Sequence, residues 1–247
     1  MSRLAQIIWQ AVGVIVMLVL LIGAGVWGYS MRPSDEPCDR LTYRIVDADK
    51  RLYLSERELD SLLRKDDLYP IGKHLDRLRI ARIEHAVRNH PMVERAECYL
   101  TPMNEVRVEI YQRVPILHVQ TPIENYFVDS RHRVMPWREQ IQDDVLVVTG
   151  SVGPQAATTS LAEIAEWLQT DAYWRERIQR IHMRTPQMAV ILLKGDNQPQ
   201  VVMGRLNGYP HKLAKLQVFL NNTAEITQLQ QYRELDIRFH GQVIGRK

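Results

Sequence analysis

The chain opens with an apolar segment and continues as amphipathic sequence. Between Ile7 and Tyr29 the only strongly polar residue is Gln10. A helix of this length spans roughly 34 Å, which is enough to cross a bilayer core of about 30 Å. Trp9 and Trp27 lie near its two ends, where aromatic rings favour the membrane interface. The pattern predicts a cytoplasmic tail at 1–6, a transmembrane helix at 7–29 and a linker at 30–37.

A cleaved signal peptide is the alternative to a retained anchor. A signal peptide has an apolar region of about 7–15 residues, followed by a cleavage site of small residues. Gly23, Ala24 and Gly25 resemble such a site, but the apolar run is longer and continues through Trp27, which favours an anchor. Basic residues flank both ends of the segment, so charge alone leaves the orientation open. The short tail and the large remainder favour a single-pass type II topology with the large part outside.

Residues 38–113 show the polarity pattern of a β-α-α-β-β domain. Leu41–Ile45 alternates between apolar and polar residues, as a strand with one buried face does. Ser55 and Glu58 form a capping box that starts a helix. A second helix is expected from Leu75–Asn89, before Pro91 stops it. Two strands follow at 96–100 and 106–111. Two helices cover only one face of a three-stranded sheet, so the other face and a strand edge are expected to stay open.

Residues 114–247 have the pattern of a second, strand-rich α+β domain. Strands are expected at 116–119, 126–129, 133–135, 145–149, 178–183, 188–193, 200–203, 235–239 and 242–244, and helices at 161–168 and 209–220. The expected fold class is therefore a single transmembrane helix followed by an α+β ectodomain of two domains.

Charge and motifs exclude several classes of function. The chain has 32 basic and 29 acidic residues, and Arg3 is the only charged residue before Met31, so the ectodomain is nearly neutral. A nucleic-acid-binding protein would concentrate basic charge. The eight histidines are scattered, and the sequence contains no HExxH, Walker loop or GxGxxG motif. We expect no catalytic residues, cofactor, metal or small-molecule substrate. An envelope hydrolase is the enzymatic alternative, and no pair of carboxylates or nucleophile–histidine pair indicates one.

The two cysteines, Cys38 and Cys98, both lie on the outer side of the predicted anchor. An oxidising compartment permits a disulfide between them. Two separate buried thiols are the alternative, because a bridge requires Cα atoms within about 7 Å.

Four segments, in their order along the chain, resemble the FtsQ/DivIB family of bacterial division proteins. The first resembles the end of a POTRA (polypeptide-transport-associated) helix, its proline stop and the next strand, and the second resembles the domain junction. The third resembles a hairpin in which Asp follows an apolar pair, and the fourth resembles the last long strand. They are Ile83–Ala96, Val106–Ile116, Tyr126–Asp129 and Leu235–Phe239.

This resemblance implies a POTRA-like domain at 38–113 and a β domain at 114–247, both periplasmic and anchored in the inner membrane at the division septum. It implies a scaffold and not an enzyme. Its partners would be FtsB, FtsL and other divisome components, which it would link to septal peptidoglycan synthesis. A membrane-anchored POTRA protein of secretion or outer-membrane assembly is the alternative.

The resemblance also implies strand addition at the C-terminal edge of the β domain. We expect Phe239 to be the aromatic anchor and Arg238 to pair with a partner carboxylate. Alternatively, the odd-numbered residues of this segment all fill the core. The expected partner-binding residues are Leu235, Ile237, Arg238, Phe239, His240, Gly241, Gln242, Val243 and Ile244. A second candidate edge, in the POTRA-like domain, comprises Val93, Arg95, Glu97 and Tyr99, unless its charged residues shield it.

Overall fold

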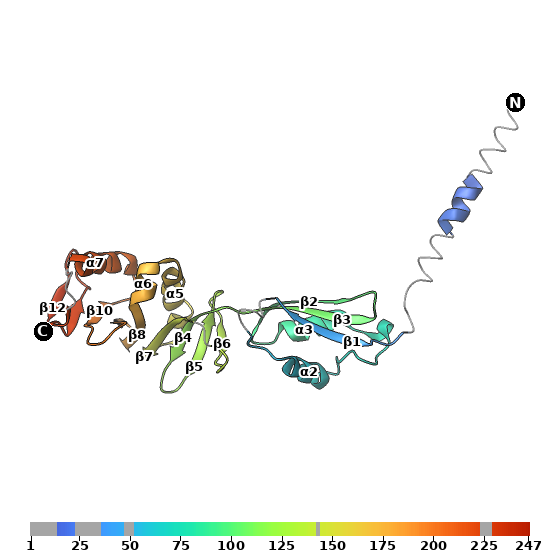
Figure 1. Ribbon diagram of the computed structural model, residues 1–247, viewed down its shortest axis with the longest axis horizontal. Helices are drawn as coiled ribbons and strands as arrows, with labels where there is room; N and C mark the ends of the chain where they lie inside the picture. Colours follow the sequence, from blue (N-terminus) through green and yellow to red (C-terminus); the bar gives the residue numbers. More distant parts are fainter. Residues whose placement is uncertain (1–13, 23–35, 47–51, 142–143, 223–228) are drawn as a thin grey trace, which may run out of the picture.

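The computed structural model describes residues 14–22, 36–46, 52–141, 144–222 and 229–247. Figure 1 shows two folded parts that follow one another along the long axis, with the terminal strands farthest from the N-terminal helix. We call residues 38–113 the first domain and residues 114–247 the second domain.

Residues 14–22 form a helical segment at the N-terminal end. All nine side chains are large and apolar, and each is more than half exposed. Within the described ranges, no helix is both long and apolar enough to span a bilayer. The rest of the predicted span at 7–29 lies outside the described residues.

The first domain has the predicted β-α-α-β-β order. Its elements are β1 (Arg40–Ile45), α2 (Glu56–Lys65), the 3-10 helix η1 (Leu75–Arg77), α3 (Ile80–Arg88), β2 (Val93–Leu100) and β3 (Glu105–Gln112). The sheet order is β1-β3-β2, with β1 parallel and β2 antiparallel to β3. Ser55 caps α2 by accepting a hydrogen bond from the Glu58 backbone N–H at 3.2 Å, as the sequence predicted.

The second predicted helix is divided between η1 and α3. Its first turn instead pairs with the chain that enters the domain, because Leu75 N–H donates to the Glu36 carbonyl at 3.1 Å and His74 forms a bridge with Pro37. Leu78 then takes an extended conformation, with ψ of 129°. This extended residue interrupts the predicted helix, and α3 begins after Arg79.

The structure decides between the two alternatives for the cysteines. Cys38 and Cys98 are both free and buried. Cys38 precedes β1 and Cys98 lies in β2, so β3 stands between them. Two inter-strand spacings of about 4.8 Å exceed the reach of a disulfide. Burial raises the pKa of the Cys98 thiol to about 12, which favours an unreactive thiol. The bridged alternative is therefore wrong.

The second domain is built on a nine-stranded sheet. Its order is β12-β11-β10-β9-β8-β7-β4-β5-β6. The strands are β4 (Pro115–Gln120), β5 (Asn125–Asp129), β6 (Val134–Pro136), β7 (Leu146–Gly150), β8 (Ile178–Thr185), β9 (Met188–Leu193), β10 (Gln200–Gly204), β11 (Glu234–Asp236) and β12 (Ile244–Arg246). The helices are α4 (Pro154–Ala157), α5 (Ser160–Thr170), α6 (Ala172–Arg177) and α7 (Tyr209–Asn222).

Helical crossovers cover one face of this sheet. The parallel pairs β7–β8 and β10–β11 need long connections, which contain α4 to α6 and α7 respectively. These helices lie along one side of the strands in Figure 1. Trp174, Leu161 and Leu213 from this layer are buried in the core of the second domain.

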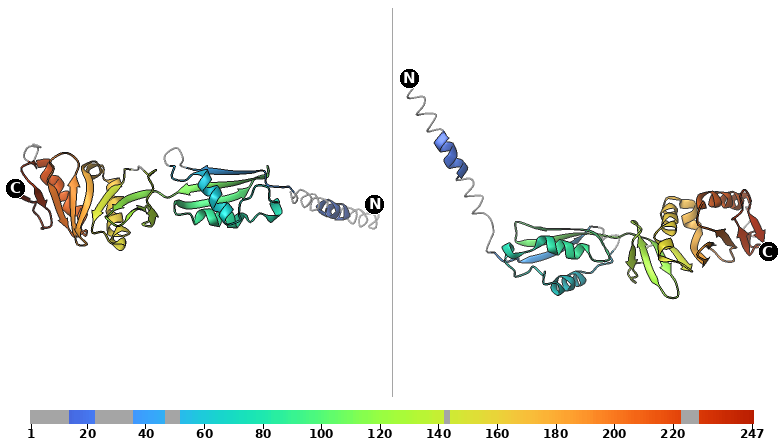
Figure 2. Two further views of the ribbon diagram at one scale, coloured as in Figure 1. Left: turned by 90° about the horizontal axis from the view of Figure 1, so that it is seen from below. Right: turned by 180° about the vertical axis from the view of Figure 1, so that it is seen from behind.

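β5 belongs to two cores at once. Tyr126 and Val128 are buried in the core of the second domain, whereas Phe127 between them is buried in the core of the first. Neighbouring side chains of a strand point to opposite faces, so β5 is covered on both sides. Met135 and Ile141 also join the core of the first domain. The two domains therefore meet in a shared apolar joint. Figure 2 shows β5 and β6 next to the first domain.

Candidate partner-binding site

β12 forms the outer edge of the nine-stranded sheet. It pairs antiparallel with β11, which in turn pairs parallel with β10. Within the part of the chain that the structure describes, no strand pairs with the other side of β12. An edge strand presents backbone N–H and C=O groups that another chain can pair with.

Side chains occupy backbone groups at two other sheet edges. At β6, the Val134 carbonyl accepts a hydrogen bond from Arg113 at 3.0 Å, and Pro136 has no N–H to donate. At β2, the Cys98 N–H donates to Glu84 at 3.3 Å and the Val93 carbonyl accepts from Arg113 at 3.4 Å. Among the described side chains, none is bonded in this way to the backbone of β12.

The residues proposed for the β2 edge divide between the two faces of the first sheet. Val93 is buried in the core. Arg95 and Glu97 form an ion pair at 3.2 Å, and the Tyr99 hydroxyl donates to Glu109 at 3.0 Å. These exposed contacts, together with the bond from Glu84 to the strand, support the alternative of a shielded edge.

A buried carboxylate holds the end of β11. Asp236 is fully buried and accepts hydrogen bonds from the Arg238 backbone N–H at 3.1 Å and from the Arg238 guanidinium at 2.6 Å. These hydrogen bonds lower the pKa of the Asp236 carboxyl, although burial acts in the opposite direction. Arg246 of β12 adds a second cation, with its nitrogen 3.8 Å from the carboxylate. Arg238 is thus already paired within the chain, and the geometry does not support its predicted pairing with a partner carboxylate.

The predicted strand at 235–239 ends at Asp236, and this changes where the later side chains lie. Leu235 and Ile237 are fully buried, whereas Phe239 is 44% exposed. Lys215 of α7 donates to the backbone carbonyls of Ile237 and Phe239 and holds the chain in this course. The alternative that all the odd-numbered residues fill the core is therefore correct for Leu235 and Ile237 and wrong for Phe239.

The chain turns between the two terminal strands and exposes most of the remaining predicted residues. His240, Gly241 and Gln242 are exposed, and Gly241 has a φ of +73°, which glycine adopts without strain. Val243 packs partly on the core, and Ile244 is 37% exposed in β12. Exposed apolar surface is thus offered by Ile244 in β12 itself and by Phe239 in the segment that connects β11 to β12.

Gly245 in β12 is required by the close approach of an aromatic ring. A Cβ at this position would lie 2.4 Å from the ring of Tyr232. We expect Gly245→Ala to lower the free energy of unfolding by about 1–2 kcal/mol, because the ring or the strand must move. Chemical denaturation measures this loss. Gly153→Ala is the control, since a Cβ there meets nothing within 4 Å. Equal stability of the two variants would show that the Tyr232 ring does not restrict the residue at position 245.

Sequence reasoning missed the charged part of the joint between the domains. Asp129 is fully buried and accepts hydrogen bonds from the backbone N–H groups of Arg131 at 2.9 Å and Arg133 at 2.8 Å. Glu94 of the first domain forms ion pairs with these same two arginines. The basic run Arg131-His132-Arg133, which follows Asp129 in the sequence, was the feature that could have indicated this contact.

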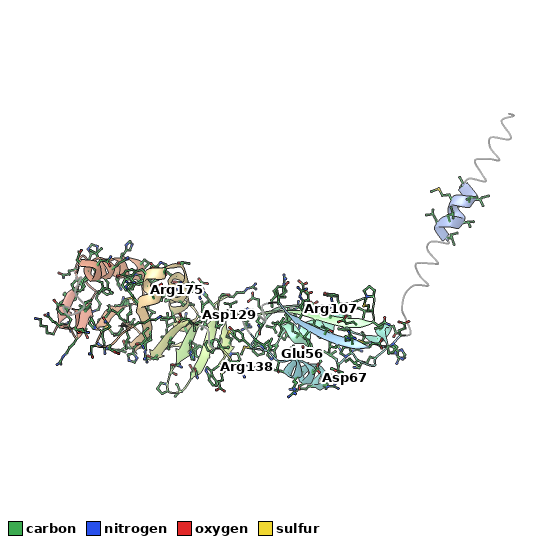
Figure 3. The ribbon with its side chains drawn as sticks, in the orientation of Figure 1. Glu56, Asp67, Arg107, Asp129, Arg138 and Arg175 are labelled. Carbon is green, nitrogen blue, oxygen red and sulfur yellow. The ribbon has the colours of Figure 1, made fainter. Side chains whose placement is uncertain are left out.

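A second ionic contact crosses the joint from α2. Arg138 donates to both carboxylate oxygens of Glu58, at 2.5 and 3.0 Å, and His90 lies 3.1 Å from the same carboxylate. Figure 3 shows Arg138 and Asp129 where the two domains meet. Burial favours a higher pKa for Glu58, but the hydrogen bond and charge of Arg138, with His90, outweigh it and lower the pKa. Burial lowers the pKa of His90, and Glu58 opposes this only in part.

Acidification is expected to lower the stability of the folded protein at this contact. The pKa values of Glu58 and His90 are both lowered in the folded state, so the unfolded chain binds these protons more readily. The free energy of unfolding therefore decreases as the pH decreases. The His90 contribution is lost as the pH falls below about 6.5, and the Glu58 contribution as it falls below about 4.3. Denaturation at several pH values measures the slope, and we expect His90→Gln to flatten it between about pH 7 and pH 5. An unchanged slope in this variant would exclude His90 as its source.

In the described ranges, no group of three or more His, Cys, Asp or Glu side chains is placed to hold a metal ion. The buried acids Asp129 and Asp236 are both engaged by arginines.

Comparisons with known proteins agree with this architecture. Residues 36–111 match the model of the POTRA-like domain, and residues 114–246 match the model described as FtsQ/DivIB, C-terminal related. No curated protein matches the chain at a significant level. Because the second match covers more than half of the 247 residues, the chain belongs to the FtsQ/DivIB family of cell division proteins.

Proposed function

We propose that this protein is a non-enzymatic scaffold of the bacterial divisome. It is anchored in the inner membrane as a single-pass type II protein, with both domains in the periplasm at the division septum. It binds an FtsB- and FtsL-like pair and so links early division proteins to septal peptidoglycan synthesis. The observation that carries this proposal is the open β12 edge, with exposed Ile244 in that strand and exposed Phe239 in the segment leading to it.

The helical segment 14–22 supports the membrane anchor. It presents nine consecutive large apolar side chains to its surroundings, and none of them packs in either core. A contiguous exposed apolar surface of this kind marks a contact with lipid or with another protein. Its place in a longer apolar run favours lipid.

Strand addition to β12 explains how a partner would bind. Backbone pairing provides affinity, and side chains next to the edge provide specificity. Ile244 in β12 and Phe239 in the preceding segment are the exposed apolar side chains that we expect the partner to contact. Arg238 instead supports them from within the chain, through Asp236.

Capture of FtsB- and FtsL-like ectodomains by purified residues 31–247 tests the proposal. We expect truncation after Gly241, which removes β12 and leaves the buried Leu235 and Ile237 in place, to abolish capture. Phe239→Ala should weaken binding roughly 30-fold, the usual effect of truncating an aromatic anchor. Tyr99→Ala on β2 is the matched aromatic control and should bind as wild type does.

The outcomes separate the remaining alternatives. If a folded truncated protein binds as tightly as the wild type, β12 is not the docking edge. If Tyr99→Ala is the variant that loses binding, the partner uses β2. If the wild type captures neither partner, the scaffold proposal fails in favour of a POTRA protein of secretion or outer-membrane assembly.

A further inference from the structure

A basic cavity lies at the end of the first domain that receives the chain from the N-terminal helix. It has a volume of about 290 Å³. Its charged lining consists of Lys73, Arg77, Arg79, Arg82, Asp66 and Asp67. Lys73 and Asp67 neutralise each other in an ion pair at 3.0 Å. The remaining charged groups of the lining are the three arginines and the Asp66 carboxylate, so the cavity has a net positive charge.

The three arginines are not engaged elsewhere in the described part of the chain. None of their guanidinium groups makes a hydrogen bond or ion pair with a described residue, whereas most arginines of the joint are paired twice. Arg79 also stands before the first turn of α3, which has no side-chain cap and no acidic residue. The free N–H groups of that turn add positive potential to the same cavity. The cavity is thus electrostatically complementary to an anion, and guanidinium groups suit a phosphate.

The backbone fixes where this cavity faces. Residues beside it are bonded to the segment by which the chain enters the domain: the Cys38 N–H donates to the Lys73 carbonyl at 2.9 Å, and Leu75 N–H donates to Glu36 at 3.1 Å. Figure 3 shows Asp67, which lines the cavity, on the side of the N-terminal helix, and Arg138 of the second domain on the far side of α2. Only residues 30–35 separate the predicted span from the described domain, and such a length reaches at most about 21 Å.

We infer that this cavity binds the phosphate of an anionic phospholipid headgroup in the membrane that holds the protein's own anchor. This inference rests on the membrane anchoring proposed above. Each basic residue near an anionic surface raises membrane affinity about fivefold, so three unpaired arginines are enough to orient a domain that is already tethered. The contact would fix the tilt of the first domain on the bilayer, and through the joint also the direction of the second domain.

Hydrogen exchange of the full chain in nanodiscs tests this inference. One set of discs contains phosphatidylcholine alone, and the other contains about one third phosphatidylglycerol. We expect the backbone amides of residues 73–82 to exchange at least about threefold more slowly in the anionic discs. Bound headgroups stabilise the folded form of this segment, and exchange requires its local opening. The triple variant Arg77→Gln, Arg79→Gln, Arg82→Gln should lose this difference.

A charge-matched variant controls for the overall change in charge. Arg57→Gln, Arg180→Gln, Arg233→Gln removes three exposed arginines away from the cavity and should keep the protection. Equal exchange in the two discs, or protection that survives the cavity variant, would overturn the inference. Equal protection by inorganic phosphate in phosphatidylcholine discs would show a site for a soluble anion and overturn the lipid assignment.

The same experiment distinguishes this inference from the proposed anchor. If the full chain does not enter the discs, the anchor is wrong and the lipid site falls with it. If the chain enters the discs but residues 73–82 are unprotected, the anchor stands and only the lipid site is wrong.

Discussion

Replacement of Phe127 by alanine is expected to lower the free energy of unfolding by about 3–5 kcal/mol, as for other buried aromatic residues. Phe127 is only 2% exposed and stacks on His118 with ring centroids 4.3 Å apart. It belongs to β5 of the second domain but is buried in the core of the first. Its removal therefore leaves a cavity in the contact that joins the two domains.

The shape of the unfolding curve should change as well. A shared core favours a single cooperative transition of both domains, and its loss should separate that transition into two. Calorimetry of residues 31–247 measures both effects. Ile123→Ala is the control, because its side chain is 91% exposed and substitution should change stability by less than about 0.5 kcal/mol. A loss below about 1 kcal/mol for Phe127→Ala would show that the joint is not a packed core.

Asp236→Ala is expected to cost about 2–3 kcal/mol and to abolish partner capture. Removing one partner of a buried ion pair generally costs about 3–5 kcal/mol, but Arg238 is 36% exposed and water can solvate it after the substitution. The substitution also removes the acceptor for the Arg238 backbone N–H and the nearby charge for Arg246. The turn and β12 then lose the side-chain contacts of Asp236 and keep the backbone pairing with β11 and the Arg246–Glu234 ion pair.

Asp236→Asn separates these contributions. The amide oxygen keeps an acceptor for Arg238 but removes the charge, so we expect a smaller loss of stability and partial capture. Denaturation together with the capture assay measures both variants. If Asp236→Ala is as stable as the wild type and binds equally well, the buried carboxylate does not support the edge.

Local patterns predicted the elements of this chain better than its contacts. The β-α-α-β-β order and the Ser55 cap could be predicted because alternation, capping chemistry and proline stops act within a few residues. The division of the second helix could not, because it depends on the extended conformation of Leu78, which periodicity does not encode. The parallel pairings of β10 with β11 and of β4 with β7 also depend on long connections that periodicity does not encode.

The candidate site was located by resemblance but not resolved in detail. Side chains alternate between the two faces of a strand, which predicted that Leu235, Ile237 and Phe239 share one face. This holds only as far as the strand continues. The strand ends at Asp236, so Phe239 becomes exposed. Arg238 reads as a free surface cation in the sequence, and only the buried position of Asp236 two residues before it shows why it is paired. The arginines around the cavity at Arg79 carry no sequence motif at all.

The side-by-side order of the nine strands determines how far the second domain extends from the joint. The sheet begins at β6 beside the joint and ends at β12, and its strands follow one another along the long axis of the molecule (Figure 1). Eight inter-strand spacings amount to roughly 38 Å. Under the proposed anchoring and docking at β12, this length would set the height above the membrane at which a partner is bound, and a partner tethered to the same bilayer would need a stalk of matching length.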